Sequence, residues 1–364
     1  MNLGNVYRFS YTQSAMQEGN DVLIGSNLAR TVSFSFDLTS KTVIDALSMI
    51  DGKASLADII ASSGLSDDDV SEFVGLVSLF IDNNVVELFD EKEKAKSAKQ
   101  IQSVDYERFD RQINLFKHAL GSFDQAIDVQ NRLDSCKVAI VGLGGCGSYV
   151  FYTLSAMGIG SIKSYEFDNV ERSNLSRQVL YTHDDIGRPK AEVAEEKGKK
   201  ISPTTDFIFV NKMILSIEDA VDVFEDVELV ICSADNPRPA FFELMNKAAY
   251  MTDTPLLYAG SSTTNAVVGP LVIPGSTRCY KCINYVEPTE QFDFVKNIQR
   301  EYFTTLIDPY NAVSGSLAAL EAIKFLTEFD ECQIIESTMF FDFSNYEVDK
   351  DSNVYSGRCA ICSP

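Results

Sequence analysis

The chain has 364 residues, a net charge of −22, and 45% hydrophobic and 23% charged residues. This composition is typical of a globular protein of about two or three domains, and the negative charge excludes broad contact with nucleic acid or an anionic membrane. No apolar run approaches the roughly 18 residues of a membrane-spanning helix, and the first residues lack the basic and apolar parts of a signal peptide, so we expect a cytoplasmic protein.

Residues 1–90 predict a small α+β domain that is similar to a winged helix. The expected elements are a strand within 22–36, helices within 37–52, 55–64 and 65–84, and a strand at 85–89. Ser66 and Asp69 have the spacing of a capping box at the start of the third helix. Many winged helices bind DNA, but this domain holds 4 Lys and Arg against 13 Asp and Glu, which excludes a polyanion as its partner.

A charged, apolar-poor stretch over residues 91–104 predicts a linker, and a larger domain follows over residues 105–364. In this domain apolar strands alternate with helices, which predicts an α/β fold with a parallel, doubly wound, Rossmann-like sheet. The expected strands lie in the stretches CKVAIVG, SIKSYEF, FIFVNKMI and VELVICSAD.

A glycine-rich loop follows the first of these strands. Gly142, Gly144 and Gly147 have the spacing G-x-G-x-x-G, with Gly145 between them, and such a loop binds phosphates at the start of a helix. The next strand ends in Glu166 and Asp168, and an acidic residue at this place takes the hydroxyl groups of a ribose. These residues fit NAD and ATP equally well.

The residues that follow favour ATP. The stretch FDNVERSNLSRQVLYTHDDIGRPKAE resembles the ThiF/MoeB superfamily, the ubiquitin-activating-enzyme-like adenylating enzymes. The resemblance extends to YERFDRQINLF upstream, to VICSADNP, and to GPLVIPGSTRCYKC with the terminal GRCAIC, so it covers residues 105–364 in order. Glu166 stands where the family usually has Asp, which keeps the charge and lengthens the side chain by one carbon.

The resemblance implies Mg²⁺-dependent transfer of AMP from ATP, a reaction that needs cations and a metal rather than a nucleophile. It implies that Glu166 and Asp168 bind the ribose and that Asp235 holds Mg²⁺. It also implies that three polar side chains approach the phosphates, namely Asn174, Arg177 and Lys190. Arg111 matches a family arginine that reaches the site of the partner subunit, which implies a homodimer.

Two C-x-x-C pairs predict a metal site. Cys279, Cys282, Cys359 and Cys362 can supply four thiolates to a structural zinc ion, which would close a long loop and fasten the C-terminal residues. True ubiquitin-activating enzymes carry a thioester-forming cysteine after the first pair, but residues 283–315 contain no cysteine. We therefore expect no covalent transfer through this region.

The N-terminal domain resembles PqqD-like recognition elements, which bind the leader of a ribosomally made peptide as an added strand. Joined to an adenylating domain, it resembles the peptide-modifying enzymes of microcin C and pantocin A biosynthesis. The resemblance implies ATP-dependent activation of a carboxyl or amide group on a ribosomal precursor peptide bound through its leader, followed by nucleotidylation or internal cyclisation. Two alternatives stay open: adenylation of a ubiquitin-like sulfur-carrier protein, and an NAD-dependent oxidoreductase or nucleotide-sensing module.

Overall fold

The structure is a computed structural model in which the chain forms two compact units, Met1–Asp128 and Val129–Pro364. It describes residues 1–10, 14–18, 21–25, 34–37, 40–83, 85–89, 105–235, 240–284, 305 and 307–362. The predicted linker at 91–104 lies outside these residues. Among the described helices, none is long and apolar enough to cross a membrane.

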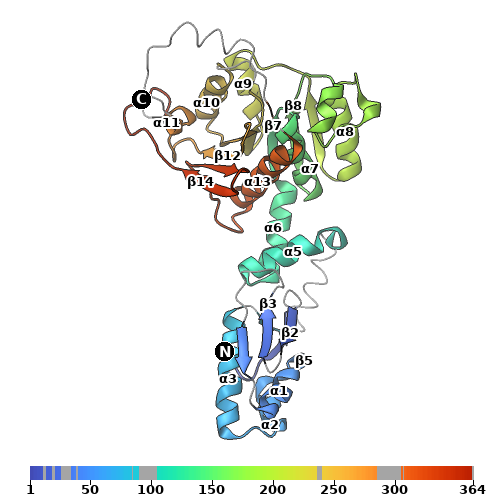
Figure 1. The fold of residues 1–364 in the computed structure, drawn as a ribbon, viewed down its shortest axis with the longest axis vertical. Coiled ribbons are helices and arrows are strands. Elements are labelled where there is room, and N and C mark those ends of the chain that lie inside the picture. Colours follow the sequence, from blue (N-terminus) through green and yellow to red (C-terminus); the bar gives the residue numbers. More distant parts are fainter. Residues whose placement is uncertain are drawn as a thin grey trace. The chain divides into compact units, whose positions relative to one another are not determined.

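The first unit contains two small antiparallel sheets (Figure 1). One sheet has the order β5-β1-β6 and consists of Asp51–Ser55, Val6–Phe9 and Val86–Leu88. The other has the order β2-β3-β4 and consists of Ser14–Glu18, Asp21–Gly25 and Phe34–Asp37. Strands in β3, β4 and β6 were expected from the sequence, whereas β5 was not, because its sequence DGKAS has the composition of a turn.

Three helices of this unit match the predicted ones: α1 (Lys41–Ser48), α2 (Leu56–Ser62) and α3 (Asp67–Asp82). The capping box of Ser66 and Asp69 is confirmed, since each side chain binds the backbone N–H of the other residue. The apolar face of α3 is buried in a core with residues of α1 and α2. Helix α5 (Tyr106–Leu120) also belongs to this unit, and α6 (Phe123–Ser135) crosses the boundary between the units.

The second unit is built on an eight-stranded sheet with the order β14-β13-β12-β11-β10-β7-β8-β9. Five neighbouring strands are parallel: β7 (Lys137–Val141), β8 (Ser161–Tyr165), β9 (Asp206–Val210), β10 (Leu229–Cys232) and β11 (Leu256–Ser261). This confirms the doubly wound sheet. Three antiparallel strands extend it: β12 (Asn265–Val272), β13 (Thr338–Asp342) and β14 (Glu347–Asp351).

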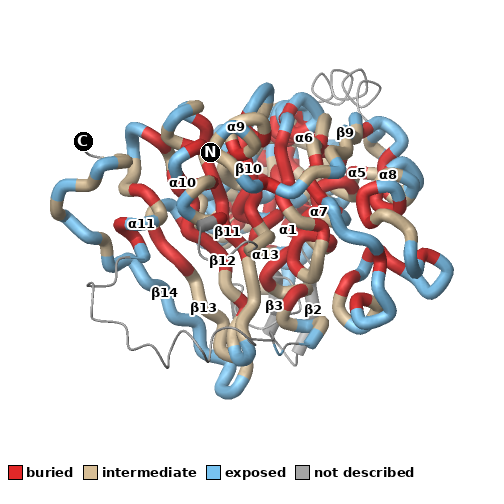
Figure 2. Tube along the Cα trace, turned by 90° about the horizontal axis from the view of Figure 1, so that it is seen from above, coloured by how far each residue is buried: buried red, intermediate tan, exposed pale blue. Residues whose placement is uncertain are grey.

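Helices cover both faces of this sheet, and Figure 2 shows β10 and β11 buried between them. Helices α9 (Ile217–Phe224) and α10 (Ala240–Thr252) share a core with Ala139, Val141, Val230 and Cys232. The alternate residues of the same strands are equally buried and face the other side. There α7 (Gly145–Ala156) packs against α8 (Lys190–Ile201) and α13 (Asp308–Thr327).

The strand order indicates where a ligand-binding crevice lies. Helices leave β7 and β10 toward opposite faces, so these two adjacent strands form the topological switch point of the parallel sheet. Ligands of open α/β sheets bind outside the carboxyl ends of the strands at such a point. The glycine loop follows β7, so the fold brings it to this crevice.

Candidate active site

A pocket of about 660 Å³ lies at the carboxyl ends of β7, β8, β10 and β11. It brings together nine residues that the sequence predicts for the nucleotide site: Gly142, Gly144, Gly145, Glu166, Asp168, Asn174, Arg177, Lys190 and Asp235. They come from five separate segments of the chain. One pocket therefore collects the predicted glycines, acids and cations, as a nucleotide site requires.

The glycines of the loop have two different roles. Gly142 has φ +86°, and a Cβ on Gly147 would lie 1.9 Å from the Gly142 carbonyl oxygen, so these two positions need glycine for the fold. A Cβ on Gly144 would approach nothing closer than the Gln178 amide nitrogen at 3.8 Å. The space above Gly144 at the start of α7 is therefore open, and it is suited to a phosphate close to backbone N–H groups.

Glu166 is buried and holds the glycine loop to the end of β8. One carboxylate oxygen accepts from the Leu143 N–H at 2.8 Å, and the other accepts from the N–H groups of Phe167 and Asp168 at 2.8 and 2.9 Å. The extra carbon of Glu relative to Asp accounts for this reach across two strands. Glu166 also lines the pocket, and its role in ribose binding stays a prediction.

Lys190 and Asp168 form an ion pair in the pocket wall. The Lys190 ammonium lies 3.2 Å from Asp168 Oδ2, with its side chain only 5% exposed, whereas that of Asp168 is 51% exposed. The Lys190 backbone N–H also donates to the Asp168 carbonyl. This bond closes the excursion of the chain formed by residues 169–189. Within that excursion Asn174 is buried, and its Oδ1 accepts from the Glu171 N–H at 3.0 Å.

Arg177 and Gln178 follow in the same excursion. Arg177 is half-buried, and its Nη1 donates to the Ser173 carbonyl at 2.6 Å. Gln178 is buried in the pocket wall. Asn311 of α13 donates to the Arg177 carbonyl at 3.3 Å and accepts from the Cys146 thiol at 3.4 Å. The sequence prediction missed Asn311, since it is distant in the chain; for Gln178 the Arg-Gln pair was an available signal.

Asp235 follows the end of β10, on the pocket wall next to the glycine loop. Burial raises the pKa of the neighbouring Cys232 thiol to about 12, and the negative charge of Asp235 adds to that rise. A carboxylate beside a phosphate-binding loop has the chemistry that Mg²⁺ prefers. The residues Asn236 and Pro237 of the predicted strand-end motif lie outside the described residues.

Two predicted residues have other positions. Gly147 lies beneath the loop in the first turn of α7 rather than on the pocket wall. Arg111 lies on α5 of the first unit, where its side chain is 91% exposed and its Nη1 donates to Asp110 at 2.9 Å. Its predicted role at the site of a partner subunit stays a prediction.

The pocket continues along an aromatic wall that the sequence did not predict. Phe242 of α10 stacks on Tyr280 with ring centroids 5.6 Å apart, and Tyr280 lies 4.2 Å from the Tyr258 ring. All three residues line the pocket, together with Asn284. The nucleotide residues therefore share the pocket with an uncharged wall that can contact a second substrate.

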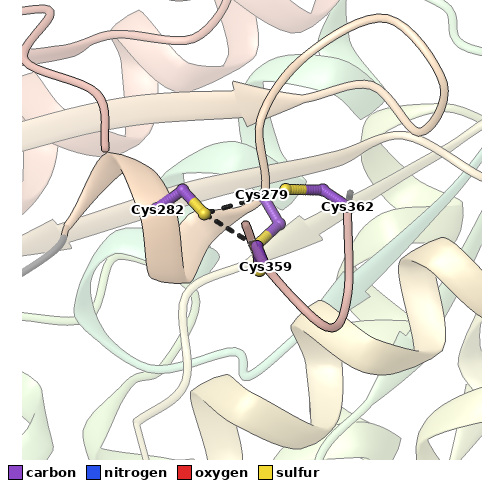
Figure 3. Close-up of side chains that lie close together, drawn as sticks. All are labelled: Cys279, Cys282, Cys359 and Cys362. Carbon is purple, nitrogen blue, oxygen red and sulfur yellow. Dashed lines mark hydrogen bonds between the residues drawn. The ribbon is translucent and has the colours of Figure 1, made fainter. Parts of the chain in front are cut away.

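The four predicted zinc ligands converge (Figure 3). Cys279 directly precedes α11 (Tyr280–Ile283) and Cys282 lies within it. Cys359 and Cys362 come from the C-terminal loop. Their sulfurs lie 3.9 Å apart for Cys279–Cys282 and 3.7 Å apart for both Cys279–Cys359 and Cys282–Cys362. A tetrahedral site with Zn–S bonds of about 2.3 Å separates sulfurs by about 3.8 Å, so the four thiolates fit zinc.

The same region fastens the C-terminal loop by hydrogen bonds. The Tyr355 N–H donates to the Cys282 carbonyl at 3.0 Å, and the Arg278 guanidinium donates to the carbonyls of Tyr355 and Gly357. The Arg278 N–H donates in turn to Glu336 at 2.6 Å. A metal at the cysteines would thus complete a set of links between α11 and the last residues of the chain.

Comparison with known proteins matches residues 109–354 to the ThiF family. The chain belongs to this family. It is an ATP-dependent adenylyltransferase of the ThiF/MoeB type. The sulfur carrier protein ThiS adenylyltransferase of Escherichia coli is 30% identical over 226 residues, which are 61% of this chain and 82% of that protein. The molybdopterin-synthase adenylyltransferase of Escherichia coli is 30% identical over 222 residues, with the same shares.

Solved structures extend the likeness in fold to nearly the whole chain. E. coli MccB, crystallised with MccA-N7isoASN, has a TM-score of 0.81 at 23% identity and covers 98% of this chain and 99% of its own. PaaA has a TM-score of 0.68 at 20% identity and covers 95% of this chain and 99% of its own. The predicted family and these two structural neighbours are confirmed.

Proposed function

We propose that this adenylyltransferase acts on a carboxyl or amide group of a ribosomally made precursor peptide, in the biosynthesis of a peptide antibiotic. The observation that carries the proposal is the extent of the fold likeness. MccB, whose structures include complexes with MccA, covers 98% of this chain, whereas the match to the ThiS adenylyltransferase of Escherichia coli covers 61%. The first unit thus has a counterpart in MccB.

The described residues support an in-line transfer of AMP. A carboxylate oxygen of the peptide attacks the α-phosphorus, the bond from this phosphorus to the bridging oxygen breaks, and pyrophosphate leaves. Lys190, Arg177 and the N–H groups after Gly144 offset the charge that gathers on the phosphate oxygens. Mg²⁺ held at Asp235 would supply further charge neutralisation on the phosphates. The aromatic wall with Tyr280 would exclude water from the activated group.

The first unit is the proposed binding site for the leader of the precursor. Its two small sheets leave edge strands that can accept an added strand, as PqqD-like elements do. Residues 1–90 carry a net charge of −9, from 4 basic and 13 acidic residues. This charge favours a leader with basic residues, and the binding should weaken as the salt concentration rises.

We further propose that the active form is a homodimer in which Arg111 of one subunit approaches the nucleotide of the other. The exposed guanidinium on α5 is free to turn away from Asp110, because exposed ion pairs of neighbouring residues contribute little stability. Each active site would then need two chains.

Adenylation of a ubiquitin-like sulfur carrier is the second candidate. It is favoured by the sequence identity of 30% to the ThiS and molybdopterin-synthase adenylyltransferases, which exceeds the 23% to MccB. It gives no role to the first unit. The absence of cysteine from residues 283–315 is compatible with both candidates.

The test measures pyrophosphate release by the full chain with ATP, CTP and GTP. It compares short peptides encoded beside the gene with small proteins that end in Gly-Gly. We expect ATP turnover to depend on a peptide with its leader, and an excess of free leader to inhibit it competitively. A leaderless core should react poorly, because leader binding raises the effective concentration of the core at the site. Turnover only with a Gly-Gly protein would replace the proposal by the second candidate.

A further inference from the structure

Asn246 of α10 is a buried polar residue beside the cysteine cluster, with an exposed fraction of 1%. Its side-chain oxygen accepts the backbone N–H of Tyr280 at 2.9 Å. Tyr280 directly follows Cys279 in the chain. The contact therefore places the Asn246 amide at the first turn of α11, where two of the four thiolates lie.

The other end of this amide has no partner of its own. The Asn246 Nδ2 is buried and finds no regular hydrogen bond within the part of the chain that the structure describes. Its orientation is fixed, because the Tyr280 N–H requires an oxygen opposite it and so assigns the two amide atoms. Buried N–H groups without an acceptor are rare in native proteins, so this one needs an explanation.

The acceptor nearest in the chain is the sulfur of Cys279, which directly precedes the Tyr280 that Asn246 binds. The Asn246 side chain lies close enough to this sulfur to interact with it electrostatically. As a thiol, this sulfur is a weak acceptor, but as a zinc-bound thiolate it carries negative charge and binds an N–H donor well. The orphaned N–H is thus matched to the metal-bound form of the site.

The negative charge of the metal-bound cysteine cluster would make a hydrogen bond from Asn246 to Cys279 favourable. One zinc ion with four thiolates has a net charge of −2, and Cys279 and Cys282 are fully buried in a chain that is itself acidic. Without donors this charge would be costly to bury. At Cys359 the backbone N–H of Ile361 approaches the sulfur at 3.5 Å. At Cys279 the buried Asn246 amide is the donor that another element makes available.

We propose that Asn246 is a positioning residue of the zinc centre, which donates its Nδ2–H to the Cys279 thiolate while its oxygen holds the Tyr280 N–H. This inference rests on the proposed zinc site. It also links the metal to the active-site pocket, because Tyr280 lines the pocket and stacks on Phe242 of the same helix α10. The metal and Asn246 together hold the aromatic wall in place.

The test uses Asn246→Asp in the full chain. This variant keeps an oxygen for Tyr280 but replaces the N–H donor by a carboxylate that faces the thiolate. We expect zinc release to an excess of a chromophoric chelator to be at least about tenfold faster, as is usual when an outer-shell partner of a metal site is lost. The control is Lys247→Gln, an equal change in charge at an exposed neighbour on α10, which should release zinc at the wild-type rate.

Cobalt gives a second measurement that a loss of stability alone would not change. With Co²⁺ in place of zinc, loss of the hydrogen bond raises the energy of the sulfur lone pairs, so the sulfur-to-cobalt charge-transfer band should shift to longer wavelength. If Asn246→Asp does not fold, Asn246→Ala removes the donor without adding charge and should give the same shift, smaller in size.

The outcomes separate the two claims. A wild-type chain purified without zinc would overturn the zinc site itself. A wild-type chain with one zinc, together with variants of unchanged release rate and unshifted cobalt band, would overturn the role of Asn246 alone. Faster release and a shifted band in the Asn246 variants, with Lys247→Gln unaffected, would establish it.

Discussion

Lys190 is a cation inside the pocket wall, and its charge is balanced by the half-exposed carboxylate of Asp168. A buried ammonium needs such a partner, because an unpaired charge would be costly or would lose its proton. Phosphate oxygens of a bound nucleotide can take over this role while Asp168 turns to the ribose or to solvent. The ion pair thus compensates the buried charge of Lys190 and holds its side chain in place in the pocket wall.

Asp235 should act on the reaction more than on binding. We expect Asp235→Ala to lower kcat by at least about 100-fold while the Kd of ATP changes only a few-fold, because metal and phosphate contacts strengthen in the transition state. Pyrophosphate release and calorimetric ATP titration measure the two quantities. Asp134→Ala, at an exposed position on α6, is the control. Normal turnover of Asp235→Ala would exclude the assigned role.

Glu166 should matter for both stability and nucleotide binding. In Glu166→Gln one carboxylate oxygen becomes an NH₂ group that faces backbone N–H donors, so we expect the free energy of unfolding to fall by about 1–3 kcal/mol. The Kd of ATP should rise, since the Leu143 peptide of the glycine loop loses its anchor. Urea unfolding and ATP titration check this against Glu192→Gln, the same change at an exposed position. Unchanged stability would mean that the three backbone contacts are dispensable.

At the scale of elements, one long excursion between β8 and α8 carries most of the polar site. Its ends are tied by backbone contacts between Asp168 and Lys190 and between Val170 and Gly187. Its second half is tied by Asp185, whose buried carboxylate accepts from Thr182 and from Lys197 of α8. The excursion thus presents Arg177 and Lys190 as a closed and fastened unit, with no regular strand of its own.

Asp185 gives this element a pH-dependent stability. Burial opposes ionisation, but the hydrogen bonds from Lys197 and Thr182 outweigh it and lower the pKa of the carboxyl to about 2. The folded-state pKa lies below the unfolded value of about 3.9. The Asp185 carboxylate therefore contributes its full stabilisation above pH about 4, and this stabilisation is lost as the pH falls toward 2. We therefore expect Asp185→Asn to lower the free energy of unfolding by about 2 kcal/mol at pH 7 and by progressively less below pH 4.

Urea unfolding of both proteins between pH 7 and pH 3 measures this difference. For Asp184→Asn, a change at an exposed neighbour, the difference in stability from the wild-type chain should not shrink in this way as the pH falls. A difference that stays constant across this range would mean that Asp185 acts without its charge.

The sequence predicted the elements that have a strong local signal. The strands β7, β9 and β10 are largely apolar, and the capping box of Ser66 and the glycine loop have fixed spacings. By contrast β14 has the sequence EVDKD and is exposed throughout, so its composition does not distinguish it from a loop. It becomes a strand because β13 offers an edge for pairing.

Some site residues lacked any local signal. Asn311 contacts Cys146 at the start of α7 although the two residues are 165 positions apart in the chain. Asn246 meets the cysteine cluster across 34 positions. Each is the single amide side chain of its helix, and only the packing of that helix decides what the amide contacts. Site residues that form a motif with a fixed sequence spacing could be predicted, whereas site residues whose contacts depend on how helices pack could not.

For the whole molecule, the family match and the fold likeness divide the chain differently. The ThiF family accounts for residues 109–354, and the segment before it is matched by the fold of MccB and PaaA. Helix α5 stands where the two parts meet in sequence, since it belongs to the first compact unit, and the family match begins within it at residue 109. Arg111 on this helix is therefore the residue through which the proposed dimer can be tested.

Mixing inactive chains tests whether two subunits share an active site. If Arg111 acts on the nucleotide of the partner, chains with Arg111→Ala and chains with Lys190→Ala should each be inactive alone. In a mixed dimer, the site in the Arg111→Ala subunit has its own Lys190 and the arginine of its partner. Random exchange makes half of the dimers mixed, each with one intact site, so we expect recovery of about one quarter of the wild-type rate.

The control mixture distinguishes sharing from any general effect of exchange. Lys190→Ala and Asp235→Ala alter the same site of the same subunit, so neither site of their mixed dimer is intact and no activity should return. Exchange is confirmed separately by mass measurement of tagged chains. Recovery in the first mixture and none in the second requires that Arg111 crosses between subunits. If exchange occurs and neither mixture recovers, Arg111 does not act on the site of the partner, and the shared active site is excluded.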